Sequence, residues 1–250
     1  MLYPNQINIY HLQNFPQKLY NNPPMKNQYF GDNRDLFKFD LAQTLTEKSQ
    51  QQLNQIYYIP MLTPNTTKPD GRQTDRCRAK AGHKNVKLVE YLDNCISTGR
   101  RNIKEIKQYY HEENVKISIY QEDEYFTHAG RPAYFSQINQ SLLNNSLILL
   151  DPDNGMEVKS SDEKHILYTE IEMLYNHMNE NSVLMIFQYF PRIEHNKYTI
   201  QRKEDIKRCV GKDVNVYSIA DDVIVFFLIA KTPAIAENVK TDSPGQLSGG

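Results

Sequence analysis

The sequence predicts an α/β protein with a doubly wound, mostly parallel sheet that ends in an antiparallel hairpin. Short, continuous apolar runs bounded by turn-forming residues are typical of strands buried on both faces, as parallel strands are. Segments with a helical spacing of apolar residues separate these runs, and this alternation builds a parallel sheet with helices on both faces. The last two runs, Val214–Ile219 and Val223–Ile229, are so close together that they predict a hairpin at one edge.

The composition agrees with one globular domain. Hydrophobic residues make up 39% of the 250 residues and charged residues 24%, which is enough apolar material for a core. We expect a loose extension over residues 1–25, one domain over 26–235 and a disordered tail over 236–250, because both ends are rich in polar, Pro or Gly residues. A net charge of −1 argues against a globally basic nucleic-acid-binding surface and still permits a local basic patch.

The cysteines and the hydropathy bear on location. The three cysteines form no Cys-x-x-Cys pair, so we expect no disulfide framework or Cys-based zinc site, and we expect a cytoplasmic protein. The longest apolar run, Val223–Ala230, is far shorter than a membrane span, and no basic segment followed by an apolar one indicates a secretory signal. We therefore expect no membrane association.

The first element expected in the domain is a helix capped by Asp32. Helical spacing places four apolar residues on one face, namely Leu36, Phe37, Leu41 and Leu45. Asp35 and Lys38, three residues apart, can pair on the other side. An ordinary capped helix is one interpretation; the other is that Gly31 leaves backbone amides open to an anionic group.

The next segments predict a strand, a long loop and more helices. Ile56–Leu62 is the first buried strand, and Pro60 places its end. The loop over 63–84 is polar and contains Arg72, Arg76, Arg78 and Lys80, so it either contacts the phosphates of a nucleic acid or is simply solvated. Beyond it we expect helices over 85–97, 101–112 and 131–143, with a strand over 115–120.

The central strand is Leu147–Leu150, and it ends abruptly in Asp151-Pro-Asp-Asn-Gly155. Pro152 removes a backbone donor and Gly155 permits positive φ, so the chain must leave the sheet there. Acidic and amide groups are thus placed at the carboxyl end of a central strand, where open α/β sheets bind ligands. An acidic turn that only ends the strand is the alternative.

The remaining elements complete the sheet. Ser160-x-x-Glu163 has the pattern of a capping box and predicts the start of a helix. Ser182–Phe187 is a second strongly apolar strand, followed by Gln188-Tyr-Phe-Pro-Arg192. Lys203–Val210 is expected to be helical and to end at Gly211.

Two motifs resemble class I, Rossmann-like methyltransferases, whose sheets also close with an antiparallel hairpin. Residues 28–38, Gln-Tyr-Phe-Gly-Asp-Asn-Arg-Asp-Leu-Phe-Lys, are similar to the amino-terminal segment of RlmJ-type ribosomal RNA adenine methyltransferases. Leu149-Leu-Asp-Pro152 is similar to the start of the Asp-Pro-Pro-Tyr motif of exocyclic-amine methyltransferases. The pattern also resembles a group of uncharacterised bacterial and phage proteins with Tyr-Phe-Gly-Asp near the start and Leu-Asp-Pro-Asp-Asn-Gly in mid-chain.

The chain departs from the methyltransferase pattern in two places. The turn after the first strand has no glycine before Gly71, although these enzymes have a Gly-rich turn there. Asp153-Asn154 stands where the Asp-Pro-Pro-Tyr motif has its second Pro and the aromatic residue that stacks on the target base.

The resemblance implies an S-adenosylmethionine-dependent methyltransferase that acts on an exocyclic amine of a nucleic-acid base. Asp151 and the Pro152 carbonyl would accept hydrogen bonds from the target amine and orient its lone pair, which is catalysis by positioning. Lys38 and Asp153 are the further catalytic candidates. The cofactor-binding candidates are Gly31, Asp32, Thr63 and Pro152. The substrate-binding candidates are Asn154, Gln188 and Arg192.

Arg192 follows the second apolar strand and could hold a phosphate bidentately, or pair with a carboxylate in a structural role. We expect it to converge on one cleft with Asp32, Lys38, Asp151 and Asp153.

A divalent-metal-dependent nuclease or phosphohydrolase is the alternative function. Pro152-Asp153 followed by Glu157-Val-Lys159 has the residue types of the Pro-Asp…Glu-x-Lys nuclease signature, but three intervening residues are too few to reverse the chain between two strands. Asp151, Asp153 and Glu157 could still gather Mg²⁺, which prefers oxygen ligands. A non-catalytic Rossmann-like module is the third possibility.

Overall fold

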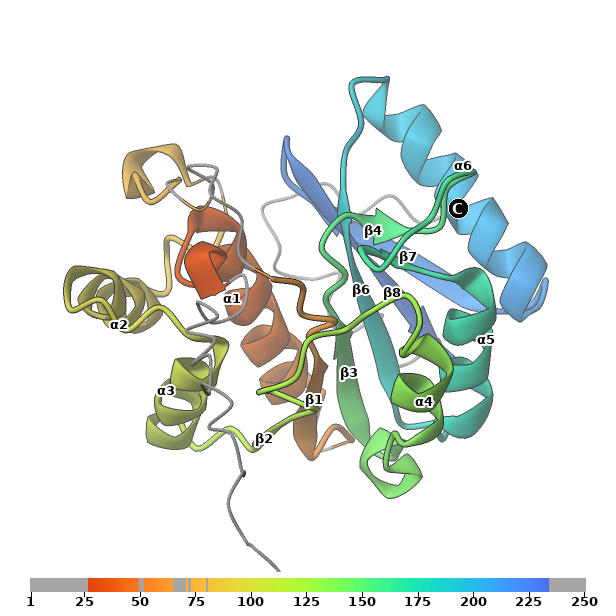
Figure 1. Cartoon of the computed structure of the whole chain (residues 1–250), viewed down its shortest axis with the longest axis horizontal. Helices are drawn as coiled ribbons and strands as arrows, with labels where there is room; N and C mark the ends of the chain where they lie inside the picture. The colour runs from red at the N-terminus through yellow and green to blue at the C-terminus, as the bar shows by residue number, and fades with distance from the viewer. Residues whose placement is uncertain (1–26, 50–51, 65–70, 72, 80, 234–250) are drawn as a thin grey trace, which may run out of the picture.

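The computed structural model describes residues 27–49, 52–64, 71, 73–79 and 81–233. The expected extension over 1–25 and tail over 236–250 lie outside these residues. The described residues form an α/β fold around a six-stranded sheet of order β2-β1-β3-β6-β8-β7 (Figure 1). Its strands are β1 (Gln55–Ile59), β2 (Ile117–Ile119), β3 (Ser146–Leu150), β6 (Val183–Tyr189), β7 (Asn215–Ala220) and β8 (Ile224–Ala230).

The sheet is Rossmann-like and mostly parallel, as the sequence predicts. β3 is an interior strand, in which Leu147 lies opposite Ile56 of β1 and Val183 of β6, and both pairings are parallel. β2 pairs with β1 in parallel at one edge. β8 is antiparallel to both β6 and β7, so the closing hairpin is confirmed, with β7 as the edge strand.

Helices cover both faces of the sheet (Figure 1). One face packs against α1 (Asn33–Lys48), α2 (Val86–Ser97) and α3 (Ile106–Glu112). The other face packs against α4 (Arg131–Ser136), α5 (Tyr168–His177) and α6 (His195–Val210). Every residue of β3 is buried, because its side chains alternate between two apolar layers. Full burial of each large apolar side chain contributes about 1.5–3 kcal/mol relative to exposure, so this strand is a main source of stability.

Short elements join the main ones. The single-turn helices are η1 (Asn27–Tyr29), η2 (Arg76–Arg78), η3 (Ile103–Glu105) and η4 (Gln140–Leu143). A small parallel sheet of β4 (Gly155–Met156) and β5 (His165–Ile166) follows the central strand, and the sequence does not signal it. The expectation that Ser160 starts a helix is wrong: α5 begins at Tyr168, where the Glu170 carboxylate accepts a hydrogen bond of 2.8 Å from the Leu167 amide.

Another helix, α6, differs from its expected form. α6 begins at His195 instead of Lys203, and the Glu194 side chain caps it. Its first turns have little apolar periodicity, since Ile200 is 63% exposed. α2, expected over 85–97, spans Val86–Ser97; it buries Leu88, Leu92 and Cys95, while Val86 is exposed. No helix in the described part of the chain combines the length and apolar character needed to cross a membrane.

Candidate functional site

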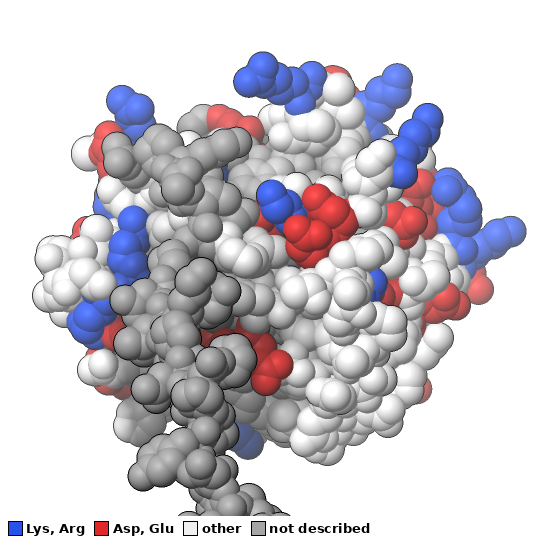
Figure 2. All heavy atoms as spheres, in the orientation of Figure 1, with Lys and Arg blue, Asp and Glu red and all other residues white. Residues whose placement is uncertain are grey.

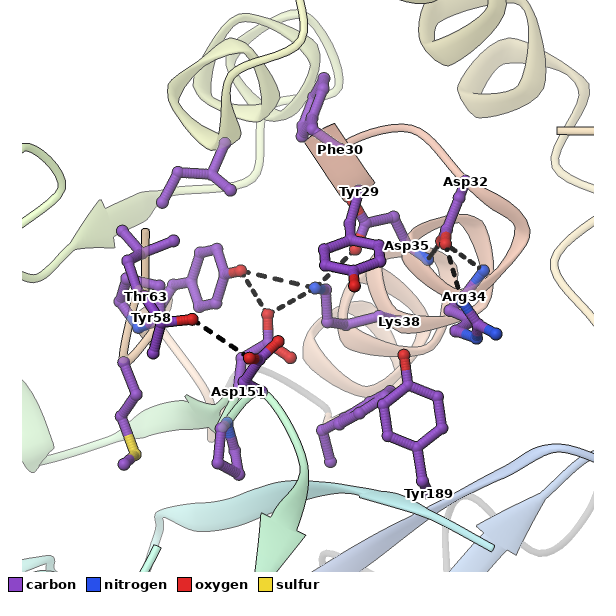
Figure 3. Close-up of a pocket in the computed structure, with 17 residues that line it drawn as sticks. Tyr29, Phe30, Asp32, Arg34, Asp35, Lys38, Tyr58, Thr63, Asp151 and Tyr189 are labelled. Carbon is purple, nitrogen blue, oxygen red and sulfur yellow. Dashed lines mark hydrogen bonds and ion pairs between the residues drawn. The ribbon is translucent and has the colours of Figure 1, made fainter. Parts of the chain in front are cut away.

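A pocket lies where the carboxyl ends of β1, β3 and β6 meet the start of α1 (Figure 3). Its cavity volume is about 70 Å³. Six charged side chains line it, four carboxylates and two cations, which leaves a formal charge of −2. They are Asp32, Asp35, Asp151, Asp153, Arg34 and Lys38. Figure 2 shows acidic atoms gathered near the middle of the viewed face. Such a pocket attracts cations and hydrogen-bond donors.

Lys38 lies at the centre of the charged groups. Its ammonium nitrogen is 2.6 Å from Asp35 Oδ1 and 2.6 Å from Asp151 Oδ2. The Tyr58 hydroxyl donates a hydrogen bond of 2.6 Å to the same Asp151 oxygen and accepts one of 3.4 Å from Lys38. The Lys38 side chain is only 6% exposed. The pairing of Asp35 with Lys38 is therefore confirmed, but the pair is buried in the pocket instead of lying on an outer side of the helix.

The pKa shifts follow from burial and from these partners. Burial favours the neutral amine of Lys38, but Asp151 and Asp35 outweigh it and raise the lysine pKa well above its usual value. Burial raises the pKa of Asp151 and of Asp35, and Lys38 opposes both shifts. Burial and the Asp151 charge raise the pKa of Tyr58. Lys38 is therefore a fixed cation and not a candidate general base at neutral pH.

Asp151 keeps one oxygen for other partners. Its Oδ2 receives both Lys38 and Tyr58. Within the described residues, no donor reaches its Oδ1. The Asp151 backbone amide still bonds the Ile59 carbonyl of β1, so the residue continues the strand ladder and its position is fixed. The Asp151 carboxylate therefore has a fixed orientation, and its side chain is 17% exposed. Its Oδ1 lies at the pocket wall and can accept a hydrogen bond from a ligand.

The side chain of Gln188, on the neighbouring strand β6, holds the turn after β3 through hydrogen bonds. Gln188 accepts a hydrogen bond of 2.7 Å from the Met156 amide, and donates to the carbonyls of Tyr189 and Asn154. Gly155 has φ +107°, as the sequence predicts, and a Cβ there would lie 2.4 Å from Gln188 Oε1. Gln188, expected to bind substrate, is thus placed to hold the backbone and does not line the pocket.

Thr63, Pro152 and Asp153 do line the pocket, and the Thr63 hydroxyl donates a hydrogen bond of 3.1 Å to Asp153. The turn between β1 and Thr63 bends without a glycine. Met61 takes φ +41° there, with its side chain buried. A non-glycine residue in this region costs about 1–3 kcal/mol, so the surrounding core must stabilise the turn.

The amides at the start of α1 are not open to an anion, which corrects the expectation for Gly31. The Gly31 amide donates to Asp35 at 3.0 Å, and Asp32 accepts from the amides of Arg34 and Asp35. Asp32 is thus a helix cap that also borders the pocket. The expected basic loop is partly structural as well: Arg76 pairs with Asp93 at 2.7 Å and donates to the Gly31 carbonyl.

Arg192 and Asn154 do not join the pocket. Both are exposed, and neither is among the lining residues. The convergence expected for five residues therefore holds for Asp32, Lys38, Asp151 and Asp153 only. Arg78 pairs with Asp75, and Arg72 and Lys80 of the basic loop lie outside the described residues.

The three carboxylates of the metal alternative are not brought together. Glu157 accepts a hydrogen bond of 2.9 Å from the Tyr168 amide at the start of α5. Across the described ranges, no three His, Cys, Asp or Glu side chains gather closely enough to hold a metal ion. The arrangement of Asp151, Asp153 and Glu157 thus does not fit a shared Mg²⁺ site.

Sequence reasoning missed several lining residues. Tyr58 lies in an apolar run and reads as core, and Arg34 reads as an exposed helix position. Tyr29 lies within the Tyr-Phe-Gly-Asp motif without being singled out, and Tyr189 carries no motif, although it ends a strand beside the central one. The available signal was the position of Tyr58 and Tyr189 near the carboxyl ends of parallel strands.

Comparison with known proteins adds no relative. No family model matches the chain, and no curated protein or solved structure matches it either. The functional reading therefore depends on the motifs and on the geometry of this pocket.

Proposed function

We propose that the chain is an S-adenosylmethionine-dependent methyltransferase acting on an exocyclic amine of a nucleic-acid base. One observation carries the proposal: Asp151 ends the central strand with one carboxylate oxygen bound by Lys38 and Tyr58 and the other left to accept. A target amine that donates its N–H to a fixed acceptor has its lone pair oriented for reaction.

The pocket fits the reacting groups of this chemistry. S-adenosylmethionine, when bound, supplies an electrophilic methyl group on a positively charged sulfonium, and a lining with a formal charge of −2 favours a cation. A volume of about 70 Å³ holds roughly five water molecules, which is room for reacting groups and not for a whole cofactor. Thr63 and Asp32 border this space and are the residues proposed to meet the cofactor.

The residues of the chain have separate tasks in this proposal. Asp151 Oδ1 and the Pro152 carbonyl would each accept an N–H of the amine, so that its lone pair points into the pocket. Lys38 opposes the rise in the Asp151 pKa that burial causes, because an ammonium at 2.6 Å favours the carboxylate. Tyr58 fixes the carboxylate rotamer through its hydrogen bond. Asp153 accepts a hydrogen bond from Thr63 and contributes negative charge to the pocket lining.

The test is calorimetric titration of the full chain with S-adenosylmethionine, together with methyl transfer to single-stranded DNA and RNA. We expect binding by the wild type, and expect Asp151→Asn to bind the cofactor while its turnover falls at least about a hundredfold, the scale of losing an electrostatic positioning group. Absence of cofactor binding at millimolar concentration would contradict the proposal. A parallel titration with Mg²⁺ tests the metal alternative, which requires binding that Asp151→Asn and Asp153→Ala both weaken.

A further inference from the structure

A second pocket lies between α4, η4 and α5, on the other face of the sheet from the first pocket. Figure 1 shows α4 beside α5, across the sheet from α1. The cavity volume is about 540 Å³, which is within the range of about 300–1,000 Å³ typical of small-molecule sites. The two pockets share no lining residue. Ligand binding at the second pocket is therefore independent of the proposed methyl transfer.

The walls of the second pocket are mostly apolar. Three of the lining side chains are buried in the core on this face of the sheet, namely Phe135, Ile138 and Leu143. The other apolar lining residues are Pro132, Leu167 and Met173. The exposed polar residues at the rim are Ser136, Gln140, Thr169 and His177. Such a lining binds a ligand mainly by removing its apolar surface from water.

The charged side chains of this pocket cancel one another. Arg131 and Glu170 both line it, and Arg131 Nη1 is 2.6 Å from Glu170 Oε2. With a neutral His177, the lining has a formal charge of zero, whereas the first pocket has −2. A charged ligand would lose its hydration here without gaining a counter-charge, so the pocket favours an uncharged ligand.

The Nε–H of Arg131 is a buried donor without an acceptor. The other guanidinium nitrogens are occupied, because Nη1 bonds Glu170 and Nη2 bonds the carbonyls of Asp162 and His165. Arg131 is 7% exposed, and its Nε has almost no solvent contact and no hydrogen-bond partner among the described residues. An unpaired buried donor costs free energy, and a guanidinium forms the stronger, charge-assisted hydrogen bonds. A ligand with an acceptor could recover that cost, and a purely apolar ligand could not.

We propose that the second pocket binds an uncharged, mostly apolar small molecule that places one hydrogen-bond acceptor, such as a ketone or ester carbonyl, at Arg131 Nε. The apolar walls supply most of the affinity. Arg131 determines which apolar molecules bind, and Glu170 holds the guanidinium in place through its two hydrogen bonds.

The experiment compares three ligands of similar shape, each of which displaces the uncharged fluorescent probe N-phenyl-1-naphthylamine from the full chain. Benzophenone is uncharged and has a carbonyl acceptor, diphenylmethane lacks the acceptor, and 4-benzoylbenzoate adds a carboxylate. We expect benzophenone to bind at least about tenfold more tightly than diphenylmethane, because its acceptor pairs with a charged donor. We expect 4-benzoylbenzoate to bind more weakly than benzophenone, because its carboxylate finds no counter-charge.

Thr169→Trp tests where these ligands bind. Thr169 is an exposed residue of α5 at the rim, so an indole there should obstruct the pocket without disturbing the core, and benzophenone binding should be lost. Asn176→Trp is the matched control, since Asn176 is also exposed on α5 but does not line the pocket, and it should bind benzophenone as the wild type does. Equal binding of benzophenone and diphenylmethane, tighter binding of 4-benzoylbenzoate, or unchanged benzophenone binding by a folded Thr169→Trp would overturn the inference.

Discussion

Two clusters of buried charged side chains lie on opposite faces of the sheet, and they differ in their balance of charge. On the α5 side, Arg131 Nη1 donates to both oxygens of Glu170 at 2.7 and 2.6 Å. Its Nη2 bonds the carbonyls of Asp162 and His165. One cation meets one anion, both side chains are under 10% exposed, and the Leu167 amide uses Glu170 as well. The charges of this pair balance, although Arg131 Nε has no hydrogen-bond partner among the described residues and both side chains border a second pocket.

The charges on the α1 side do not balance. Lys38 lies between two carboxylates, so the cluster has an excess negative charge, and Asp151 keeps one oxygen without a donor among the described residues. A pair with equal and opposite charges is typical of a structural role, whereas a pocket with an excess of one charge is typical of a binding site. The difference indicates which cluster stabilises the fold and which is placed to meet a charged ligand.

The largest expected effect is on the balanced pair of Arg131 and Glu170. Glu170→Ala leaves the Arg131 guanidinium buried without its carboxylate, and removing one partner of a buried pair costs about 3–5 kcal/mol. Urea denaturation should show a loss of that size in the free energy of unfolding. Binding of S-adenosylmethionine by the fraction that remains folded should be unchanged, because Glu170 does not line the pocket proposed for it. A loss below about 1 kcal/mol would mean that the pair is not structural.

Gly155→Ala should cost less, about 1–3 kcal/mol, because alanine is strained at φ +107° and its Cβ would meet Gln188 at 2.4 Å. The matched control is Gly99→Ala, since Gly99 also has positive φ (+72°) but nothing lies within 4 Å of an added Cβ. Gly155→Ala should also lower ligand affinity, and Gly99→Ala should not. Equal behaviour of the two variants would show that contact with Gln188 is unimportant.

Tyr58→Phe removes one hydrogen bond to Asp151 and should reduce the free energy of unfolding by about 1 kcal/mol. Its effect on turnover should exceed its effect on stability, because Asp151 loses the group that fixes its rotamer. Thermal unfolding and methyl-transfer assays measure the two quantities. A stability loss with full activity would place Tyr58 with the structural residues.

The last prediction concerns how the free energy of unfolding depends on pH through Asp151. Burial raises the pKa of Asp151 above its usual 3.8, so the folded protein retains this proton to a higher pH than the unfolded chain. The carboxyl therefore destabilises the fold progressively from about pH 3.8 to its folded pKa, and the loss is complete above it. Asp151→Asn cannot ionise there. The wild type should lose stability relative to this variant as pH rises from 4 to 8, as measured by urea denaturation; a gain would contradict the assignment.

The sequence predicts the framework well because the framework is local. β3 and the closing hairpin follow from continuous apolar runs, and Asp32 is a helix cap because its side chain bonds amides two and three residues ahead. The start of α6 was misplaced because a surface helix with an exposed Ile200 has a weak apolar period. The small sheet of β4 and β5 was missed because two-residue strands leave no pattern.

The site was predicted only in part because its contacts are distant in sequence. Lys38 and Asp151 are 113 residues apart, so a motif can mark each of them but not the bond between them. The sequence signal of Asp35 is its helical spacing from Lys38, and that of Tyr58 is its place in an apolar strand. Both signals indicate a structural role instead of a site. Arg192 was expected at the pocket because it follows β6, but it lies beyond Pro191 in an exposed segment.

The hydrogen bonds of Gln188 restrict how the pocket can move. One carboxamide bonds the Met156 amide on the turn after Asp151 and the Tyr189 carbonyl on β6. The turn that follows Asp151 and the carboxyl end of β6, which carries Tyr189, are thereby joined, so neither can shift without breaking a buried hydrogen bond. Hydrogen exchange at the Met156 amide should accordingly be slow and should report opening of the whole pocket, since local fraying cannot release it. A ligand would therefore meet a preformed surface, with little reorganisation to slow its association.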